Sequence, residues 1–381
     1  MIRLENLTKV FETPSGQVVA ADKVTMEVPA GEICVLLGPS GCGKTTVLKM
    51  VNRLVPPTSG KIFIDDKDTS KLNDVQLRRS IGYVIQQIGL FPNMTIEENI
   101  CVVPKLLGCE KAKAKQRAAE LLDLVGLDAK LYLGRYPKEL SGGQQQRVGV
   151  IRALAADPPV MLMDEPFGAI DPINREVIQD EFLKMQQQIK KTIMFVSHDI
   201  DEAVKMGDKI AIFRAGTIEQ VDGPDTVLAH PANAFVADFV GADRTLKRLR
   251  LVSVEAVADV EAPAVSRHAK VRDVKSAMRE RKAAVAVLLD GDRHPVGYVS
   301  EEMIEGASGV VQDMARPLPA TVPARADLRA VVSEMFAHDV MWLVCVDEAG
   351  RFAGVVTQAA VTRVLGETYR RDDLAVREPA E

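Results

Sequence analysis

Residues 31–51 read GEICVLLGPSGCGKTTVLKMV and predict a buried β-strand, a glycine-rich loop and an α-helix in direct succession. The apolar run of the strand ends at Gly38, and Val47, Leu48 and Val51 form an apolar stripe at helical spacing. The loop between them fits the pattern G-x-x-x-x-G-K-[ST] at every fixed position. We therefore expect an α/β fold in which this loop binds phosphate groups.

The glycine-rich loop contains the residue types that hold a triphosphate. Its glycines let the backbone wrap around phosphate groups, Lys44 reaches the β- and γ-phosphates, and Thr45 is able to hold Mg²⁺. A glycine-rich turn with a surface lysine is the alternative, but strand, loop and helix occur in the order that phosphate binding requires. The candidate nucleotide-binding residues of the loop are Gly38, Pro39, Ser40, Gly41, Cys42, Gly43, Lys44, Thr45 and Thr46.

Two acidic residues follow a second apolar strand. Residues 160–166 read VMLMDEP, and the uninterrupted apolar run is typical of a buried strand in a parallel sheet. Ligands bind at the carboxyl ends of such strands, so Asp164 is placed to hold Mg²⁺ and Glu165 to polarise an attacking water. Two solvated acids in a turn are the alternative, but a phosphate loop needs an acidic partner of this kind.

Polar residues also follow two further predicted strands. Residues 192–196 form an apolar run, and His198 comes two residues after its end. At the same sheet edge His198 can touch the γ-phosphate, although a histidine in this position also serves as a packing or capping residue. Gln86 follows the strand predicted at 81–85, and a polar residue at a strand end carries little information by itself.

Residues 140–147, LSGGQQQR, place a serine and two glycines at a predicted helix start. The bare backbone N–H groups and the positive end of the helix dipole at such a start suit an anion. An ordinary N-cap by Ser141 explains the same pattern. Asp171 precedes Pro172 and predicts a second helix N-cap of this ordinary kind.

The composition limits the function classes. A chain of 381 residues is too long for one compact domain, and its 47% apolar and 27% charged residues are typical of globular proteins. The formal net charge of −5 argues against a nucleic-acid partner. No apolar run approaches the ~20 residues of a membrane helix, and Glu5 lies where a signal peptide is apolar. Five scattered cysteines without a CxxC pair predict neither a disulfide framework nor a zinc site, so we expect a cytoplasmic chain.

The second half of the chain contains an internal repeat with a spacing of 57 residues. Each copy predicts an amphipathic helix, an apolar strand, an Asp-containing turn and a glycine-marked strand that ends in a hydroxyl residue. A basic cluster at 244–250 precedes the repeat, and we interpret it as a linker or a solvated helix face. The matching pairs are Val271 with Leu328, Val274 with Val331, Met278 with Met335, Val287 with Val344, Asp290 with Asp347, Gly297 with Gly354, Val299 with Val356, and Ser300 with Thr357.

These motifs together resemble those of the ATPase subunit of ABC transporters, a P-loop NTPase fold with a helical subdomain. The resemblance covers residues 1–240 and implies ATP and Mg²⁺ as cofactors. It implies that the catalytic residues are Glu165, His198 and Lys44, and that the metal lies at Thr45, Gln86 and Asp164. Besides the phosphate loop, it implies that the residues contacting nucleotide are Phe11 (by stacking on adenine), Gln86, the signature residues Ser141, Gly142, Gly143 and Gln144, and Asp171.

The same resemblance implies several partners. In this family two copies pair head to tail, so the signature of one copy faces the ATP held by the phosphate loop of the other. The segment 89–95 corresponds to the place where an integral membrane permease subunit inserts a coupling helix. A substrate-binding protein acts through that permease. The chain is therefore expected at the inner face of the cell membrane, attached as a peripheral subunit.

The repeat resembles a tandem pair of CBS domains, each a βαββα module. Nucleotide-binding CBS modules carry an acidic residue three positions after the hydroxyl, where this chain has Met303 and Ala360. Adenosine-nucleotide sensing is therefore not expected there, and a packing or dimerisation module is the alternative to a sensor. The expected boundaries are 1–240 for the ATPase domain, 241–252 for a linker, 253–310 and 311–368 for the CBS copies, and 369–381 for a flexible tail.

An ABC ATPase joined to a CBS pair resembles the energising subunit of importers for glycine betaine, choline, carnitine or proline. An ATPase for another small solute, such as an amino acid or a polyamine, is the main alternative, and its C-terminal half is more often β-rich. A non-transport ABC protein usually carries two cassettes or a long coiled coil. A non-catalytic binding module would not need Lys44, Asp164, Glu165 and His198 together.

Overall fold

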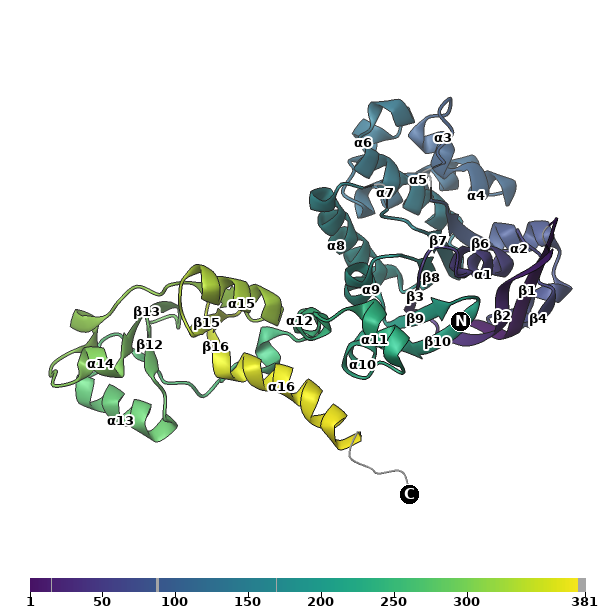
Figure 1. The fold of residues 1–381 in the computed structure, drawn as a ribbon. Helices are drawn as coiled ribbons and strands as arrows, with labels where there is room; N and C mark the ends of the chain where they lie inside the picture. The colour runs from purple at the N-terminus through teal and green to yellow at the C-terminus, as the bar shows by residue number, and fades with distance from the viewer. Residues whose placement is uncertain (15, 87–88, 169, 376–381) are drawn as a thin grey trace, which may run out of the picture. The chain divides into compact units, whose positions relative to one another are not determined.

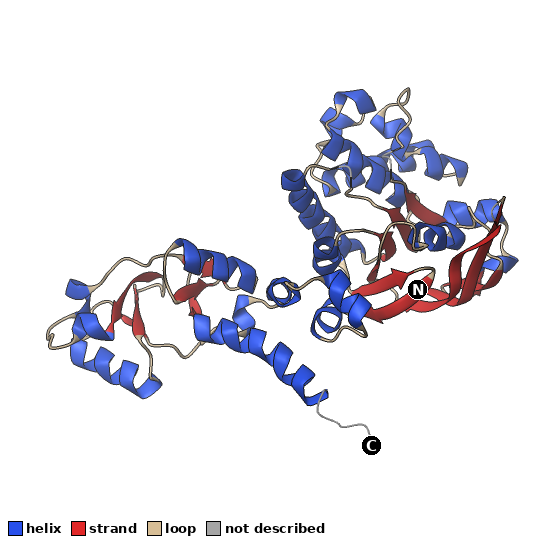
Figure 2. Cartoon of the chain, viewed as in Figure 1, coloured by secondary structure: helices blue, strands red, loops and turns tan. Residues whose placement is uncertain are grey.

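The chain forms two compact units, Met1–Gly241 and Ala242–Glu381. The computed structural model describes residues 1–14, 16–86, 89–168 and 170–375. The first unit holds two β-sheets and most of the helices, and the second holds two small sheets with their own helices (Figures 1 and 2). Each unit has separate clusters of buried apolar residues, so each is described by itself below.

A six-stranded sheet forms the centre of the first unit. Its strand order is β10-β9-β3-β8-β7-β6, in which the β9–β10 pair is antiparallel and the other pairs are parallel. Because β3, β8, β7 and β6 are neighbours and run parallel, their carboxyl ends meet at one edge. The strands are β3 (Ile33–Leu37), β6 (Ile81–Val84), β7 (Val160–Asp164), β8 (Thr192–Val196), β9 (Lys209–Arg214) and β10 (Thr217–Asp222).

Both faces of this parallel sheet are covered. On one face Leu36 and Met194 belong to the cluster that includes Leu48 of helix α1 (Lys44–Val51). On the other face the ring of Phe195 meets Phe167 edge to face, and Phe167 meets Phe182 of helix α8 (Pro172–Ile189) in the same way. Burial on both faces explains why β3, β7 and β8 read as apolar at nearly every position.

An antiparallel sheet completes the strands of the first unit. Its order is β2-β1-β4-β5, and Ile2, Leu4 and Leu7 of β1 pack into the same cluster as Leu48. This sheet brings Ala20 of β2 next to the glycine-rich loop. Its strands are β1 (Ile2–Thr13), β2 (Gly16–Val28), β4 (Ser59–Ile64) and β5 (Lys67–Asp68).

Five helices of the first unit, α3 to α7, gather apart from the antiparallel sheet (Figure 1). This group is the helical subdomain that the sequence predicted, and α7 packs against β6 and α8. The helices of the group are α3 (Ile96–Ile100), α4 (Val102–Leu106), α5 (Lys111–Leu124), α6 (Ala129–Tyr132) and α7 (Gly142–Leu154). The unit also contains α2 (Asp74–Ser80), α9 (Ile200–Met206), α10 (Pro224–Ala229) and α11 (Ala234–Val240).

The second unit contains the repeated βαββα module. The first copy comprises β11 (Ala264–Ser266), α13 (Val271–Arg281), β12 (Val285–Leu289), β13 (Pro295–Ser300) and α14 (Glu301–Ile304). The second copy comprises β14 (Thr321–Pro323), α15 (Leu328–Ala337), β15 (Trp342–Val346), β16 (Phe352–Thr357) and α16 (Gln358–Ala375). Each three-stranded sheet joins a parallel pair to an antiparallel pair, so the two copies share one topology.

The strand register confirms the repeat that the sequence predicted. Val285 pairs with Ser300 in the first copy, and Trp342 pairs with Thr357 in the second, 57 residues later in both strands. Both hairpins shift register at the equivalent place near the end of the strand. One apolar cluster takes residues from both copies, namely Val287, Leu289, Val344, Phe352 and Val355. The two copies therefore pack into one unit.

The ends of the second unit differ from the expected linker and tail. The expected linker, 241–252, contains α12 (Arg244–Arg248). Leu249, also within this range, is buried in the core of the second copy. Helix α16 extends to Ala375, into the segment expected as a tail, because 367–375 contains neither glycine nor proline to interrupt it. The rest of that tail, 376–381, lies outside the described residues.

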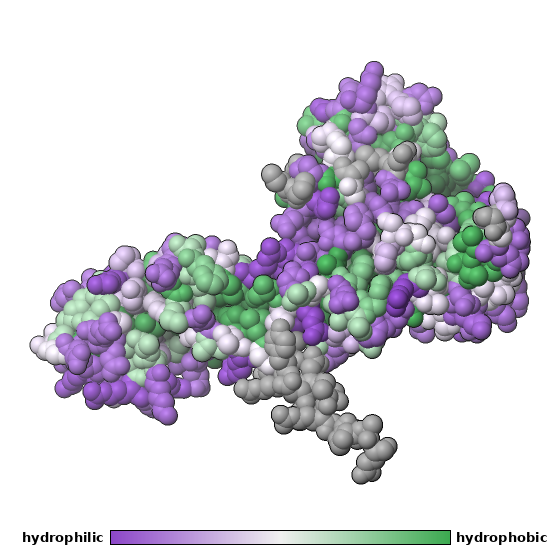
Figure 3. Space-filling model, in the orientation of Figure 1, coloured by the Kyte–Doolittle hydropathy of each residue, from purple (hydrophilic) through white to green (hydrophobic). Residues whose placement is uncertain are grey.

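Hydrophilic and hydrophobic residues are interspersed on the visible face of each unit (Figure 3). In the second unit, Phe336 and Met341 are 79% and 69% exposed. Both belong to the second copy of the repeat. The first copy carries Arg279 and Ala284 at the corresponding positions, so the two copies differ in surface character.

Candidate nucleotide site

The carboxyl ends of four neighbouring strands border an open cavity of about 510 Å³. The glycine-rich loop follows β3, His198 follows β8, Glu165 follows β7 and Gln86 follows β6. The residues that line the cavity are Ala20, Ser40, Gly41, Gly43, Lys44, Thr45, Thr46, Gln86, Glu165 and His198. All of them except Ala20 were predicted as site residues from the sequence.

Two glycines of the glycine-rich loop have no room for a side chain. Gly38 has φ +146° and Gly43 has φ +105°, where other residues are strained. A Cβ atom at Gly38 would lie 2.3 Å from the carbonyl oxygen of Phe213. A Cβ atom at Gly43 would lie 2.0 Å from the carbonyl oxygen of Ala20. The loop is therefore pressed against β2 and β9, which explains the presence of Ala20 in the cavity wall.

Lys44 is buried and is held by its own loop. Its Nζ donates hydrogen bonds to the carbonyl oxygens of Gly38 and Pro39, at 2.6 and 2.9 Å, and lies 3.6 Å from Sγ of Cys42. Lys44 is only 7% exposed, so its positive charge lies directly beneath the loop. Gly38, Pro39 and Cys42 belong to the same loop and were also predicted to bind nucleotide, but they do not line the cavity.

A hydrogen bond joins the phosphate loop, which follows β3, to Asp164 at the end of β7. Thr45 Oγ1 donates to Asp164 Oδ1 at 2.9 Å. Burial raises the pKa of the Asp164 carboxyl, whereas the hydrogen bond from Thr45 and the charge of Lys49 oppose that rise. The hydroxyl of Thr45, in the phosphate loop, and the neighbouring carboxylate of Asp164 are oxygen donors of the kind that Mg²⁺ prefers.

Glu165 is the centre of a second group of polar side chains. It has φ +47°, and its backbone N–H donates to the carbonyl oxygen of Val196 at 3.0 Å. Gln86 Nε2 donates to Glu165 Oε2 at 3.0 Å, and His198 Nδ1 lies 3.7 Å from the same oxygen. The side chains of Gln86 and His198, from the two neighbouring strand ends, therefore lie close to the Glu165 carboxylate beside the cavity.

The signature residues 141–144 do not line this cavity. Ser141 Oγ accepts a hydrogen bond from the backbone N–H of Gln144, and Gln144 Oε1 accepts one from the backbone N–H of Ser141. This capping box starts α7, so the ordinary N-cap interpretation holds locally. Gln144 Nε2 also donates to the hydroxyl of Tyr132 at 3.0 Å. Ser141 and Gly142 are exposed at the surface of this unit.

Two further predicted residues also lie outside the cavity lining. Phe11 is 37% exposed on β1, and the ammonium of Lys9 lies 4.8 Å from its ring centroid. Phe11 is therefore not a core residue. Asp171 is exposed, and its carbonyl oxygen accepts the backbone N–H of Arg175 at 2.9 Å, which begins α8. Both side chains are accessible from outside the unit.

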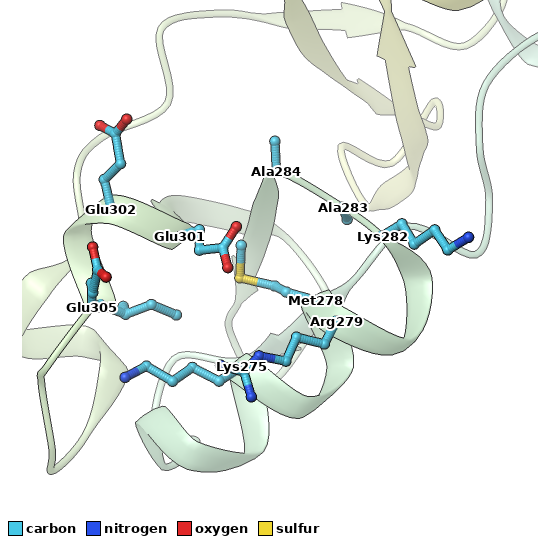
Figure 4. A pocket seen from close by; sticks show the side chains of 10 residues that line it. Lys275, Met278, Arg279, Lys282, Ala283, Ala284, Glu301, Glu302 and Glu305 are labelled. Carbon is cyan, nitrogen blue, oxygen red and sulfur yellow. The ribbon is translucent and has the colours of Figure 1, made fainter.

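The hydroxyl residues of the repeat act as helix caps. Ser300 Oγ accepts from the backbone N–H of Met303, and Thr357 Oγ1 accepts from that of Ala360. An open cavity of about 540 Å³ lies between α13 and α14, and Glu301, the residue that follows Ser300, lines it (Figure 4). A cavity of about 670 Å³ lies at the equivalent place near Thr357.

These two cavities differ in charge. Lys275, Arg279 and Lys282 form one wall of the first, and Glu301, Glu302 and Glu305 lie opposite them (Figure 4). At the positions of these three acids, the second cavity has Gln358, Ala359 and Thr362. One ligand chemistry therefore does not suit both cavities.

Two family models match the chain. The ABC transporter model matches residues 21–168, and the CBS domain model matches residues 254–307 and 311–367. The first range contains the glycine-rich loop, the signature and Asp164. The second and third ranges correspond to the two copies of the repeat.

Relatives match along almost the whole chain. The osmoprotectant import ATP-binding protein OsmV of Salmonella typhimurium is 54% identical over 99% of this chain and 100% of its own length. The chain belongs to the ABC transporter ATPase family. The glycine betaine/carnitine/choline transport ATP-binding protein OpuCA of Bacillus subtilis is 45% identical, over 98% of both chains.

Solved structures match the first unit of this ABC ATPase. The ATP-binding cassette MJ0796, in a dimeric post-hydrolysis state bound to ADP and Pi, is 34% identical. It covers 58% of this chain and 98% of its own, with a TM-score of 0.53. ABC cassettes dimerise and work with membrane permease components. The chain accordingly binds ATP and hydrolyses it to ADP and phosphate.

None of the helices in the described part of this ABC ATPase is long and apolar enough to cross a membrane. The described residues also contain no cluster of three or more His, Cys, Asp or Glu side chains able to hold a metal ion.

The buried charge of Asp164 predicts a change in stability with pH. Because burial raises its pKa above the unfolded value, the free energy of unfolding falls as pH rises through the folded-state pKa. Asp164→Asn removes this charge and keeps an oxygen that accepts from Thr45. We expect its melting temperature without nucleotide to exceed that of the wild type at pH 7, by about 2–4 °C for each kcal/mol gained.

Calorimetry over a pH series measures this effect. The gain should shrink as pH falls through the raised pKa of the folded state, where the wild-type carboxyl takes up its proton. Asp157→Asn is the matched control, because Asp157 is an exposed acid just before β7 that pairs with Lys191. A lower melting temperature for Asp164→Asn at pH 7, or a gain that does not depend on pH, would contradict the prediction.

Proposed function

We propose that the chain energises the import of osmoprotectants, namely proline or the quaternary amines glycine betaine, choline and carnitine. The observation that carries the proposal is the match to osmoprotectant ATPases along both units, including the CBS pair. A cassette alone would match many importers, whereas the combination with this second unit is what the named relatives have in common with the chain. The ATPase of another small-solute importer is the alternative that the transport test below addresses.

Within the proposal, the residues around the cavity divide the work of hydrolysis. Glu165 orients and polarises the attacking water, because its carboxylate borders the cavity and is held by Gln86. His198 contacts the γ-phosphate from the neighbouring strand end. Lys44 neutralises charge on the β- and γ-phosphates. In phosphoryl transfer, positioning and electrostatic stabilisation of this kind supply most of the catalysis.

The residues present fit a bound Mg²⁺. Thr45 Oγ1 and Asp164 Oδ1 lie 2.9 Å apart, and both are hard oxygen donors. Gln86 lies at the same cavity and supplies a third oxygen. When bound with ATP, the ion neutralises phosphate charge. Thr45, Asp164 and Gln86 are the residues that would hold the ion.

The active site is completed by a second copy of the chain. Ser141, Gly142, Gly143 and Gln144 are absent from the lining of their own cavity, and Ser141 and Gly142 are exposed at the start of α7. In a head-to-tail pair they would contact the ATP held by the partner. Asp171 and Phe11 are exposed as well, and the proposal places Asp171 near the partner and Phe11 near adenine.

The proposed membrane partner binds beside α3. Phe91 is 44% exposed, and Asn99 of α3 fixes its loop by accepting from Phe91 N–H and donating to the carbonyl oxygens of Phe91 and Met94. Arg152 donates to the carbonyl oxygen of Gly89 at 2.6 Å. This loop follows Gln86, so a coupling helix of the permease would act on the cavity through it.

The chain would then lie at the cytoplasmic face of the membrane. A substrate-binding protein would act through the permease, and the CBS pair would regulate transport.

Glu165→Gln tests the role of the carboxylate. The amide occupies the same space, and its oxygen still accepts from Gln86, but it cannot polarise water. We expect ATP binding to persist, hydrolysis to fall by about 10²–10⁴-fold, and a closed dimer to accumulate with ATP. Phosphate release and light scattering measure these effects, with Glu120→Gln on α5 as an exposed control. Ordinary turnover by Glu165→Gln would refute the assignment.

Substrate-stimulated hydrolysis tests the transport proposal. The chain is assembled with its membrane and substrate-binding subunits in liposomes, and ATP hydrolysis is measured with one solute at a time. At least one of glycine betaine, choline, carnitine and proline should stimulate hydrolysis, and Lys44→Ala should abolish the response. Stimulation by another amino acid or a polyamine instead, with none by these four solutes, would favour the alternative importer.

A further inference from the structure

A buried polar network lies behind the turn that carries His198. Ser197 Oγ donates to Glu202 Oε2, and Gln179 Nε2 donates to Glu202 Oε1 at 3.0 Å. The three residues are 1%, 7% and 3% exposed respectively. Burial raises the pKa of the Glu202 carboxyl, and the hydrogen bonds from Ser197 and Gln179 oppose this rise. Both carboxylate oxygens are therefore satisfied by neutral donors on either side.

This network joins two helices to the end of β8. Gln179 lies on α8, Glu202 lies on α9, and Ser197 directly precedes His198. The backbone N–H of Ser197 donates to the carbonyl oxygen of Leu36 at 3.1 Å, and that of Asp199 donates to Ser197 Oγ at 3.0 Å. Hydrogen bonds therefore hold the turn that carries His198 to β3 on one side and, through Glu202, to α8 on the other.

Arg175 forms a second connection between the same elements. Its NH2 nitrogen donates to the carbonyl oxygen of Ile170 at 3.0 Å, and its NH1 nitrogen lies 3.7 Å from Asp199 Oδ2. Its own backbone N–H donates to the carbonyl oxygen of Asp171. One guanidinium therefore contacts the residue before Asp171 and the residue after His198.

We propose that Arg175 is a positioning residue that couples the loop of Asp171 to the turn of His198. The Ser197–Glu202–Gln179 network is the rigid support against which this coupling works. A movement of the Asp171 loop on contact with a second copy would reach His198 through the planar guanidinium fork, whose donors are fixed relative to one another. The inference rests on the roles proposed above for His198 and Asp171.

Arg175→Gln and Arg175→Lys test the coupling in the full chain assembled with its membrane subunit. Neither side chain has a fork that spans Ile170 and Asp199. Because small misplacements of a catalytic group are costly, we expect kcat for ATP to fall roughly tenfold or more. The KM for ATP should change by less than about twofold, because the phosphate loop is untouched. Two variants are used so that a folding defect in one does not decide the result.

Lys205→Met is the matched control. Lys205 of α9 pairs with Asp180 of α8 at 2.7 Å, so this variant breaks an ion pair between the same two helices without touching either loop. We expect near wild-type kcat from this control. An equal loss of kcat in Lys205→Met and the Arg175 variants would overturn the proposal, because general loosening of the helices would then explain it.

A double-mutant cycle with His198→Ala separates the coupling from the role of His198. Single-turnover hydrolysis with excess enzyme quantifies the slow variants. If Arg175 acts through His198, Arg175→Gln should lower the rate by less than about twofold in the His198→Ala background. If Arg175→Gln lowered the rate by the same factor in the wild-type and His198→Ala backgrounds, the proposed coupling would be overturned. The proposed role of His198 would be unaffected by that result. An undiminished rate in His198→Ala itself would contradict the proposed role of His198, and the coupling with it.

Discussion

The parallel order β3-β8-β7-β6 is the constraint on which the rest of the site depends. Strands that run in one direction end at one edge, so residues from four distant parts of the sequence meet there. The hydrogen bond between Thr45 and Asp164 spans two steps of this order and ties the phosphate loop to the acidic strand. Both faces of the sheet are buried, and the strands cannot shift without exposing apolar side chains. The fold therefore fixes the cavity before any nucleotide arrives.

Much of the site was predictable because its signals are local. A strand, a glycine loop and a helix follow one another directly at 31–51, and each acid or histidine stands at a strand end. The spacing of 57 residues predicted the repeated module, and the hairpin registers agree with it residue by residue. At residues 31–51 the functional residues and the secondary-structure signals lie in one short stretch of sequence.

The remaining features depend on packing between distant segments. Ala20 belongs to the cavity because Gly43 presses against its carbonyl oxygen, and no pattern near Ala20 signals this contact. The network around Glu202 joins residues of two helices and a turn, each unremarkable by itself. Helix α16 extended into the expected tail because a polar sequence without glycine or proline gives no stop signal. Tertiary contacts of this kind become visible only once the fold is known.

The central claim is that each active site is shared between two chains, with Lys44 from one and Ser141 from the other. Mixing Lys44→Ala chains with Ser141→Arg chains tests it directly. A mixed pair then has one site with both defects and one site with neither. We predict that each variant alone is inactive and that the mixture regains ATP hydrolysis. If Lys44 and Ser141 instead served one site within a single chain, the mixture would stay inactive, and that result would contradict the account.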